Sequence, residues 1–287
     1  MHQVKLSVSL TDEITGISPV ETARANLIKI YLGYRTCYSA ETDPKRILKL
    51  PDANTLIGHT LDEISVWNMK FEEIEKLVSK CLFEFGHDSQ IEHASLQFYV
   101  TGVSRALTHQ LVRHRIASYG QQSQRYVEFS DLPVVIPTSI SEHENPEVLK
   151  RFLEHMRDTE SFYKYLISES VPAGDARFVT PQAASSAITL TMNFRALMNF
   201  FSLRCCNNAQ WEIRELANQM LAKCKQYYPS IFSQVGAKCL RLGYCPEGTK
   251  MCKSPQYLRA KRERVTGTDQ SIPDDGMRNM KERTVNE

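Results

Sequence analysis

The sequence predicts an α+β fold that is mostly helical and carries a small, mainly antiparallel sheet. Apolar residues recur at helical spacing along most of the chain, whereas the stretches 94–100 and 188–192 alternate apolar and polar residues as half-buried strands do. The chain has 287 residues, of which 42% are hydrophobic and 24% charged, as in an ordinary globular protein. We expect one domain over residues 1–257, followed by a charged, flexible tail over residues 258–287.

Capping signals and apolar stripes place the helices of the first half. Ser-Pro-Val-Glu at positions 18–21 forms a capping box with proline at the first helical position, and Gly33 is expected to end this helix. The apolar stripe of residues 70–85 predicts a second helix. A third helix, over residues 103–111, is expected to carry the cations at 113–115 at or near its end.

The second half of the chain shows three further helix signals. Asn145 precedes a helix with proline at its first position, and Asn193 is expected to cap a helix over residues 194–204. A long helix is predicted over residues 209–228, because its apolar periodicity continues until Pro229.

The net charge and the cysteines indicate which classes of protein this chain does not belong to and in which compartment it is expected. A formal net charge of +2 argues against a protein that coats nucleic acid, because such proteins present a whole basic face. No stretch approaches the roughly 20 apolar residues that span a bilayer, and the N-terminus lacks the pattern of a signal peptide. The eight cysteines, with Cys205 and Cys206 adjacent, fit free thiols in a reducing compartment. We therefore expect a cytoplasmic protein without a membrane partner.

The segment 113–125, Arg-His-Arg-Ile-Ala-Ser-Tyr-Gly-Gln-Gln-Ser-Gln-Arg, is the strongest indication of function. Neighbouring guanidinium groups repel each other, so a folded protein rarely crowds them without an anion to receive them. The guanidinium fork suits phosphate and imide oxygens, which favours a pocket for a nucleotide. If Arg113 and Arg115 lie two residues apart on a helix, their side chains fan out in different directions. They could then contact two ligands, or the two ends of one large ligand. The alternative is a solvated basic face or a set of inter-subunit salt bridges.

A second basic, amide-rich surface is expected on the predicted helix 194–204. Arg195 and Asn199 lie four residues apart and therefore share a face, and Arg204 lies a little further round. Taken singly, each would be an ordinary surface residue. Together with Arg177, they form a surface that could complete the pocket of the first basic segment.

Metal and thiol chemistry are disfavoured by spacing and by position. His87 and His93 lie six residues apart across a turn and lack the spacing of a helical zinc pair, so we expect no metal. Cys205 and Cys206 lie at the end of their predicted helix, where the helix dipole disfavours a thiolate, and we interpret them as structural. The remaining cysteines near the C-terminus are too widely spaced for a zinc knuckle: Cys239, Cys245 and Cys252.

Arg113-His114-Arg115, followed after seven residues by Ser123, resembles the signature of the flavin-dependent thymidylate synthases. The resemblance extends in order from Ser18 to Gly236, through further motifs at 86–93, 175–177, 193–204 and 209–213. It implies an α+β homotetramer whose active sites draw on more than one subunit. It also implies FAD as bound cofactor, NADPH as reductant, and methylenetetrahydrofolate as one-carbon donor in the conversion of dUMP to dTMP. Hydride would come from reduced flavin, with no cysteine attacking the uracil.

The resemblance also implies residue roles. The residues expected to contact or lie near FAD are His87, Ser89, Arg113, His114, Arg115, Gln121, Asn193, Arg195 and Asn199. The residues expected around dUMP are Gln110, Arg113, Gln121, Gln122, Ser123, Gln124, Arg125, Arg177 and Arg204. Phosphate is assigned to Ser123 and Arg125, and the uracil edge to Arg177 and Arg204. As the catalytic residue, Arg204 would stabilise the deprotonated imide at N3 and push electron density toward C5.

The chain departs from the family at Gly120-Gln121, where many members carry Asn-Glu. A glutamine keeps the hydrogen bonds of a glutamate but cannot act as a base, which motivates an alternative flavoprotein that oxidises NADPH without methyl transfer. A further alternative is a nucleic-acid-binding module that uses the basic stretch 105–125, with Tyr119 and Tyr126 available for stacking on bases.

Overall fold

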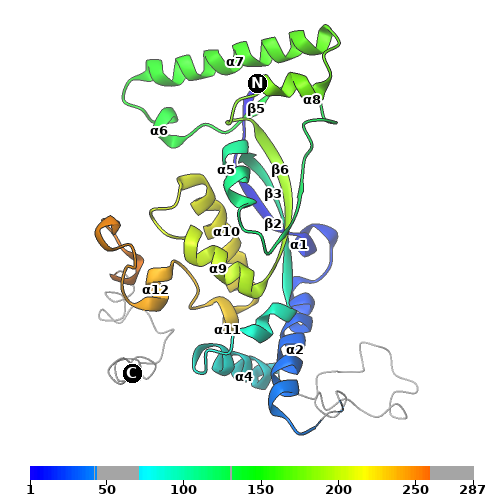
Figure 1. Ribbon diagram of the computed structural model, residues 1–287, viewed down its shortest axis with the longest axis vertical. Coiled ribbons are helices and arrows are strands. Elements are labelled where there is room, and N and C mark those ends of the chain that lie inside the picture. Colours follow the sequence, from blue (N-terminus) through cyan, green and yellow to red (C-terminus); the bar gives the residue numbers. More distant parts are fainter. Residues whose placement is uncertain (42, 44–70, 130, 259–287) are drawn as a thin grey trace, which may run out of the picture. The chain divides into compact units, whose positions relative to one another are not determined.

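The computed structural model describes residues 1–41, 43, 71–129 and 131–258 (Figure 1). The chain divides into two units, each assembled from separate stretches. The sheet unit consists of Met1–Ser18, Leu96–Met192 and Trp211–Met220. The helical unit consists of Pro19–Ser95, Asn193–Gln210 and the chain from Leu221 onward. Of the tail predicted over residues 258–287, all but Leu258 lies outside the described residues.

The sheet unit is built on four strands in the order β2-β3-β6-β4. The strands are β2 (Ser7–Leu10), β3 (Ser95–Ser104), β4 (Ser118–Gln121) and β6 (Ser185–Asn193). Strands β2, β3 and β6 lie side by side in Figure 1, and the pairs β2–β3 and β4–β6 are antiparallel. The predicted α+β fold with a small, mainly antiparallel sheet is confirmed, as are the two strands expected from alternation.

Short elements and one long helix complete the sheet unit. They are α1 (Thr11–Thr15), α5 (Arg105–Leu111), α6 (Thr138–Ser141), α7 (Pro146–Ser168), α8 (Ala173–Ala176), η3 (Arg177–Val179) and the parallel pair β1 (His2–Gln3) and β5 (Pro133–Val134). Helix α7 begins where predicted, because Asn145 Oδ1 accepts a hydrogen bond from Glu147 N at 3.0 Å. Its Met156 packs in an apolar cluster with Leu132 and Val134.

The helical unit contains most of the remaining helices. They are α2 (Pro19–Tyr38), α4 (Phe71–Phe83), η2 (Ser89–His93), α9 (Phe194–Arg204), α11 (Pro229–Phe232), α12 (Lys238–Leu242) and η4 (Gly248–Lys250), while α10 (Trp211–Tyr227) belongs partly to each unit. In its core, the Phe194 ring meets Tyr228 edge-on at a centroid distance of 4.8 Å. The buried amide of Asn26 donates to the Tyr228 hydroxyl at 3.1 Å, so this polar group is satisfied inside the core.

The prediction that Gly33 ends the first long helix is wrong, since α2 continues to Tyr38. A Cβ atom at Gly33 would press against Gln90 Oε1 and lie 3.1 Å from His93 Cδ2. Gly33 therefore allows η2 to approach α2 closely, and this use of a glycine cannot be distinguished locally from helix termination. Gly86, by contrast, has a positive φ of 68° shortly after α4, the backbone conformation typical of a glycine that ends a helix.

Strands β3 and β6 each continue into a helix without an intervening loop. Strand β3 becomes α5 at Ser104, whose hydroxyl accepts a hydrogen bond from Leu107 N at 3.0 Å. Strand β6 becomes α9 at Asn193, whose side chain accepts from Ala196 N at 2.8 Å. Both are N-cap contacts of the expected type. The buried Glu212 carboxylate also accepts hydrogen bonds from Ser104, at 2.7 Å from the backbone N–H and 2.5 Å from the hydroxyl.

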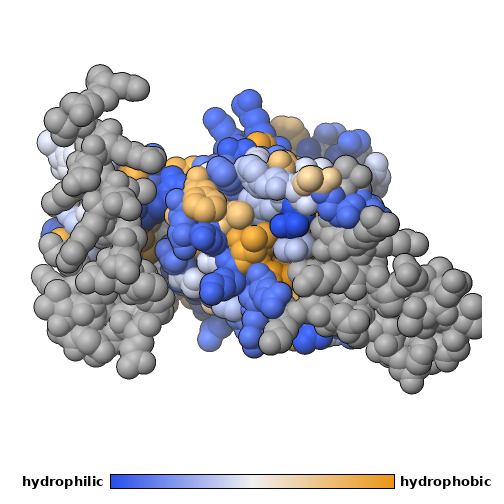
Figure 2. Space-filling view, turned by 90° about the horizontal axis from the view of Figure 1, so that it is seen from below, coloured by the Kyte–Doolittle hydropathy of each residue, from blue (hydrophilic) through white to orange (hydrophobic). Residues whose placement is uncertain are grey.

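Several large apolar side chains are exposed. Figure 2 shows hydrophilic residues over much of the visible face, with apolar residues gathered near its centre. The exposed apolar residues include Tyr38 and Phe85 in the helical unit, and Phe162, Tyr165 and Phe178 in the sheet unit. None of the helices in the described part of the chain combines the length and apolar character needed to cross a membrane.

Replacing Ser104 with alanine tests the junction between β3 and α5. Ser104→Ala should lower the free energy of unfolding by about 1–3 kcal/mol, because α5 loses its cap and the buried Glu212 loses a donor. Urea unfolding followed by circular dichroism measures the change. Ser233→Ala, at an exposed serine, is the matched control and should change stability by less than about 0.5 kcal/mol. A Ser104→Ala variant as stable as the parent would show that the cap is unimportant.

Candidate active site

The cations of the first basic segment lie in a turn just after α5. Arg113 and Arg115 are exposed there, and His114 is half-buried. The Tyr119 hydroxyl lies 3.0 Å from Leu111 O and 2.8 Å from His114 O, so it can donate to either carbonyl and hold the turn. Burial raises the pKa of Tyr119 to about 12, and the hydroxyl therefore keeps its proton at neutral pH. Because the arginines lie beyond the helix, the helical fan predicted for them does not form.

Gln121 is the glutamine found where many members of the family that the sequence resembles carry a glutamate. Its side chain is hydrogen-bonded within the sheet unit. Its Nε2 donates to Thr108 Oγ1 and to Ser186 Oγ, both at 3.2 Å. Thr108 lies on α5 and Ser186 on β6, so the Gln121 amide links β4 to both elements. Gln121 therefore has a structural role that the sequence did not predict.

The segment after β4 and the start of η3 bring two predicted dUMP ligands near each other. A Cβ atom on Gly174 would lie 3.9 Å from Arg125 Cγ, and Arg177 Nε donates to Gly174 O at 3.0 Å. Arg125 is exposed and Arg177 half-buried. The Ser123 hydroxyl accepts from Arg125 N at 3.2 Å, which folds this segment into a tight turn.

The side-chain amide of Gln124 is buried without a hydrogen-bond partner for its nitrogen in the described part of the chain. A buried amide N–H without a partner is costly, typically by about 1–3 kcal/mol. An acceptor oxygen supplied by a ligand would satisfy it.

In the helical unit, His87 lies in an aromatic environment. Its ring stacks on Tyr38 with centroids 5.4 Å apart, and the Tyr38 hydroxyl lies 2.9 Å from His87 Nδ1. The Tyr34 hydroxyl donates to the His87 carbonyl, and burial raises the Tyr34 pKa above its ordinary value. The sequence did not single out Tyr34 or Tyr38, because aromatic residues on a helix resemble core residues.

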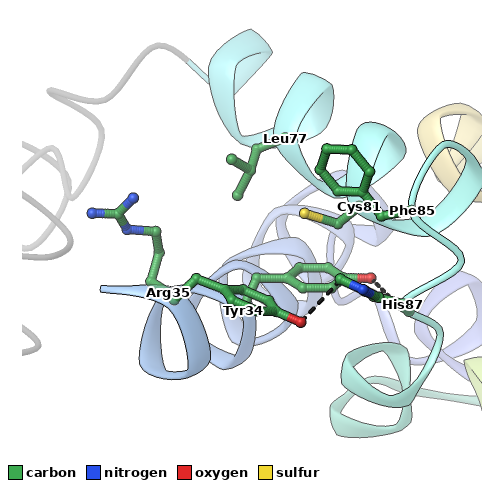
Figure 3. Close-up of a pocket in the computed structure, with 7 residues that line it drawn as sticks. Tyr34, Arg35, Leu77, Cys81, Phe85 and His87 are labelled. Atoms are coloured by element: carbon green, nitrogen blue, oxygen red, sulfur yellow. Dashed lines mark hydrogen bonds between the residues drawn. The ribbon is translucent and has the colours of Figure 1, made fainter. Parts of the chain in front are cut away.

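These residues border a pocket of about 240 Å³. Figure 3 shows Leu77, Cys81 and Phe85 on one side, Tyr34 and Arg35 opposite, and His87 at one end. The lining is almost entirely apolar or aromatic, apart from the His87 ring and the Arg35 side chain. The pocket is therefore suited to a flat ring system rather than to a free anion.

The N-terminal part of α9 carries three predicted FAD ligands. Arg195 Nη1 lies 2.6 Å from Glu92 Oε1, and Nη2 lies 3.2 Å from Asp88 Oδ1. These carboxylates raise the Arg195 pKa above its ordinary value, so the guanidinium stays charged. Asn193 uses its side-chain oxygen as the helix cap, and Asn199 is exposed one turn beyond Arg195. Ser89, also a predicted FAD ligand, is exposed in η2, the element that carries Glu92.

Arg204 is the last residue of α9 and is half-buried. The next residue, Cys205, is buried, and burial raises its pKa to about 12. Cys205 is therefore a neutral thiol at physiological pH and a poor nucleophile, in keeping with the structural role predicted for it. Among the residues that the structure describes, no three His, Cys, Asp or Glu side chains are arranged to hold a metal ion.

Comparison with known proteins identifies the family of this chain. The family model described as thymidylate synthase complementing protein matches residues 21–230. A flavin-dependent thymidylate synthase of Nitratidesulfovibrio vulgaris is 52% identical over 186 residues, covering 62% of this chain and 75% of that protein. Proteins of the same name from Geobacter sulfurreducens and Clostridium tetani are 49% and 44% identical over 185 and 197 residues. Each of these two alignments covers 63% of this chain and 78% of the relative.

Thiol burial predicts which cysteines react with an alkylating reagent. At about pH 8, iodoacetamide should modify the exposed Cys37 and leave Cys205 and Cys224 unmodified, because burial raises the pKa of both buried thiols. Peptide mass spectrometry of the native protein measures the extent of modification, and the urea-unfolded protein provides the control in which all thiols react. Modification of native Cys205 as fast as Cys37 would disprove the burial argument.

Proposed function

The chain belongs to the family of flavin-dependent thymidylate synthases, and we propose that it catalyses the reductive methylation of dUMP to dTMP. FAD is the bound cofactor, NADPH the reductant, and methylenetetrahydrofolate the one-carbon donor. The observation that carries this proposal is the turn after α5, which presents Arg113 and Arg115 of the family signature to solvent. Exposed guanidinium groups bind phosphate oxygens well.

The residues present fit FAD by the chemistry of their donors. The exposed guanidinium groups of Arg113 and Arg115 suit the cofactor's pyrophosphate, and hydroxyl and amide groups suit its polyol chain. The residues proposed to contact or lie near FAD are Arg113, His114, Arg115, Gln121, His87, Ser89, Asn193, Arg195 and Asn199. When bound, FAD supplies the hydride that completes the methyl group. The carboxylates of Asp88 and Glu92 keep Arg195 charged and oriented for the cofactor.

The proximity of both Arg125 and Arg177 to Gly174 supports a role for these two residues in binding dUMP. Arg125, with Ser123, binds the phosphate, and Arg177 binds the uracil edge. The buried Gln124 amide gains the acceptor that it lacks within the described part of the chain. The other proposed dUMP ligands are Gln110, Arg113, Gln121, Gln122 and Arg204.

Arg204 carries the proposed catalytic role. Uracil becomes nucleophilic at C5 when N3 loses its proton, because the negative charge delocalises over the ring. A guanidinium beside N3 and its flanking carbonyl oxygens stabilises that charge in place of water. No thiolate is needed for activation, which agrees with the high pKa of Cys205.

We further propose that the protein is a cytoplasmic homotetramer with shared active sites. Support comes from apolar side chains that the chain by itself leaves in water. On α7, the exposed rings of Phe162 and Tyr165 stack with centroids 6.3 Å apart. Contact with other copies would cover such residues, since gathered apolar surface commonly marks an interface.

The alternative functions have less support. Nucleic-acid binding through the basic stretch 105–125 requires free aromatic rings, yet Tyr119 is half-buried and bonded within the turn, leaving Tyr126 as the exposed ring of the two. NADPH oxidation without methyl transfer was motivated by Gln121. The contacts of its amide with Thr108 and Ser186 give the glutamine a structural role, so its presence does not by itself favour a lost activity.

The proposed reaction is tested by visible absorbance under anaerobic conditions. The purified protein should show a flavin spectrum that NADPH bleaches and that returns only when dUMP and methylenetetrahydrofolate are both added. Chromatography of the products should then show dTMP. A colourless protein unable to take up FAD would refute the proposal, and bleaching without dTMP would favour the NADPH oxidase.

Replacing Arg204 tests its catalytic role. Arg204→Ala should keep the FAD spectrum but lower dTMP formation by about 100- to 1,000-fold, the usual effect of removing one preorganised charge donor. Arg157→Ala, at an exposed arginine of α7, is the matched control and should retain parental turnover. Undiminished dTMP formation by Arg204→Ala would remove Arg204 from the mechanism.

A further inference from the structure

A segment near the C-terminus of the described chain is tied to the loop that follows α9. Gln256 Nε2 donates to Cys205 O at 2.7 Å, and Asn208 Nδ2 donates to Lys250 O at 2.8 Å. Between these contacts, Asn207 Nδ2 lies 2.7 Å from Ser254 O and 3.6 Å from Cys252 Sγ. Donors on both sides therefore join residues 250–256, here called the C-terminal strap, to the loop 205–208.

The strap contacts the loop at the C-terminal end of α9, where backbone carbonyl groups need hydrogen-bond donors. The last carbonyl groups of a helix find no N–H donor within the helix. The loop after α9 begins at the buried Cys205. Gln256 supplies a donor to that residue's carbonyl. The strap is itself packed, since Pro255 is buried and a Cβ atom on Gly236 would lie 3.9 Å from Gln256 Oε1.

The position of the strap along the chain sets it apart from the motifs already discussed. The family model ends at residue 230, so residues 250–256 lie beyond the matched region. The loop that they contact starts directly after Arg204. Arginine has a long, flexible side chain, and the position of its head depends on how firmly its backbone is held.

We propose that the C-terminal strap fixes the end of α9 and thereby positions Arg204 for dUMP, with Gln256 as the main positioning residue. This inference rests on the role proposed above for Arg204. A shift of about 1 Å in a group that acts on the reacting ring can cost up to about 100-fold in rate. Loosening the loop would therefore lower the turnover rate, even though no contact between Gln256 and the substrate is proposed.

The test compares two substitutions to methionine within the strap. Gln256→Met keeps the length of the side chain and removes the donor to Cys205 O, whereas Lys253→Met alters an exposed residue of the same segment. We expect Gln256→Met to lower kcat per bound FAD by about 10- to 100-fold, with a change of less than about threefold in KM for dUMP. Lys253→Met should match the parent. A purely structural role would instead reduce FAD content and leave kcat per bound FAD unchanged.

Hydrogen exchange supplies a readout that does not depend on turnover. The Ala209 amide donates to Cys206 O at 3.0 Å, so it should exchange faster in Gln256→Met if the strap holds this loop. Asn208→Ala, which cuts the contact from the loop side, should reproduce both effects and serves if Gln256→Met does not fold. Parental exchange and parental kcat in a folded variant would overturn the inference while leaving the proposed function intact. A parent protein that forms no dTMP would instead refute the proposed function, and with it the role of the strap.

Discussion

Side-chain capping at the starts of α5 and α9 is the interaction on which the rest of the structure depends. Each helix starts at the residue that follows a strand. The hydrogen bonds from Leu107 N to Ser104 and from Ala196 N to Asn193 fix the first turn, and with it the rotation of every later residue. Helix α5 then leads to the Arg113 turn, and α9 ends at Arg204. Glu212 adds a second constraint at Ser104 from a different part of the chain.

Neutral hydrogen bonds, rather than ion pairs, hold most of the candidate site. The hydroxyl of Tyr119, the amide of Gln121 and the hydroxyl of Tyr38 each fix a predicted ligand residue or its neighbour. The ion pairs of Arg195 are about half exposed, where water and salt screen them. The Arg113 and Arg115 side chains are exposed, which suits the binding of anionic ligands.

Local chemistry explains which features could be predicted from the sequence. The starts of α2, α7 and α9 were predicted correctly, because capping residues act within three positions of the helix start. The glycine at position 33 was misinterpreted, since its purpose is contact with η2 more than fifty residues away. The sequence correctly predicted that the arginines follow the helix now seen as α5. It did not predict that the Tyr119 hydroxyl holds their turn, because no short motif indicates that hydrogen bond.

The sequence by itself determined the fold class, the longer helices, two strands of the sheet and the family, because each depends on periodicity, caps or short motifs along the chain. Only the tertiary structure decided which polar groups are already engaged. It places Arg195 beside Glu92, 103 residues away, leaves Gln124 buried without a partner in the described chain, and joins the strap to the loop after α9. Such contacts depend on the packing of distant segments, and burial then sets the pKa of groups such as Cys205.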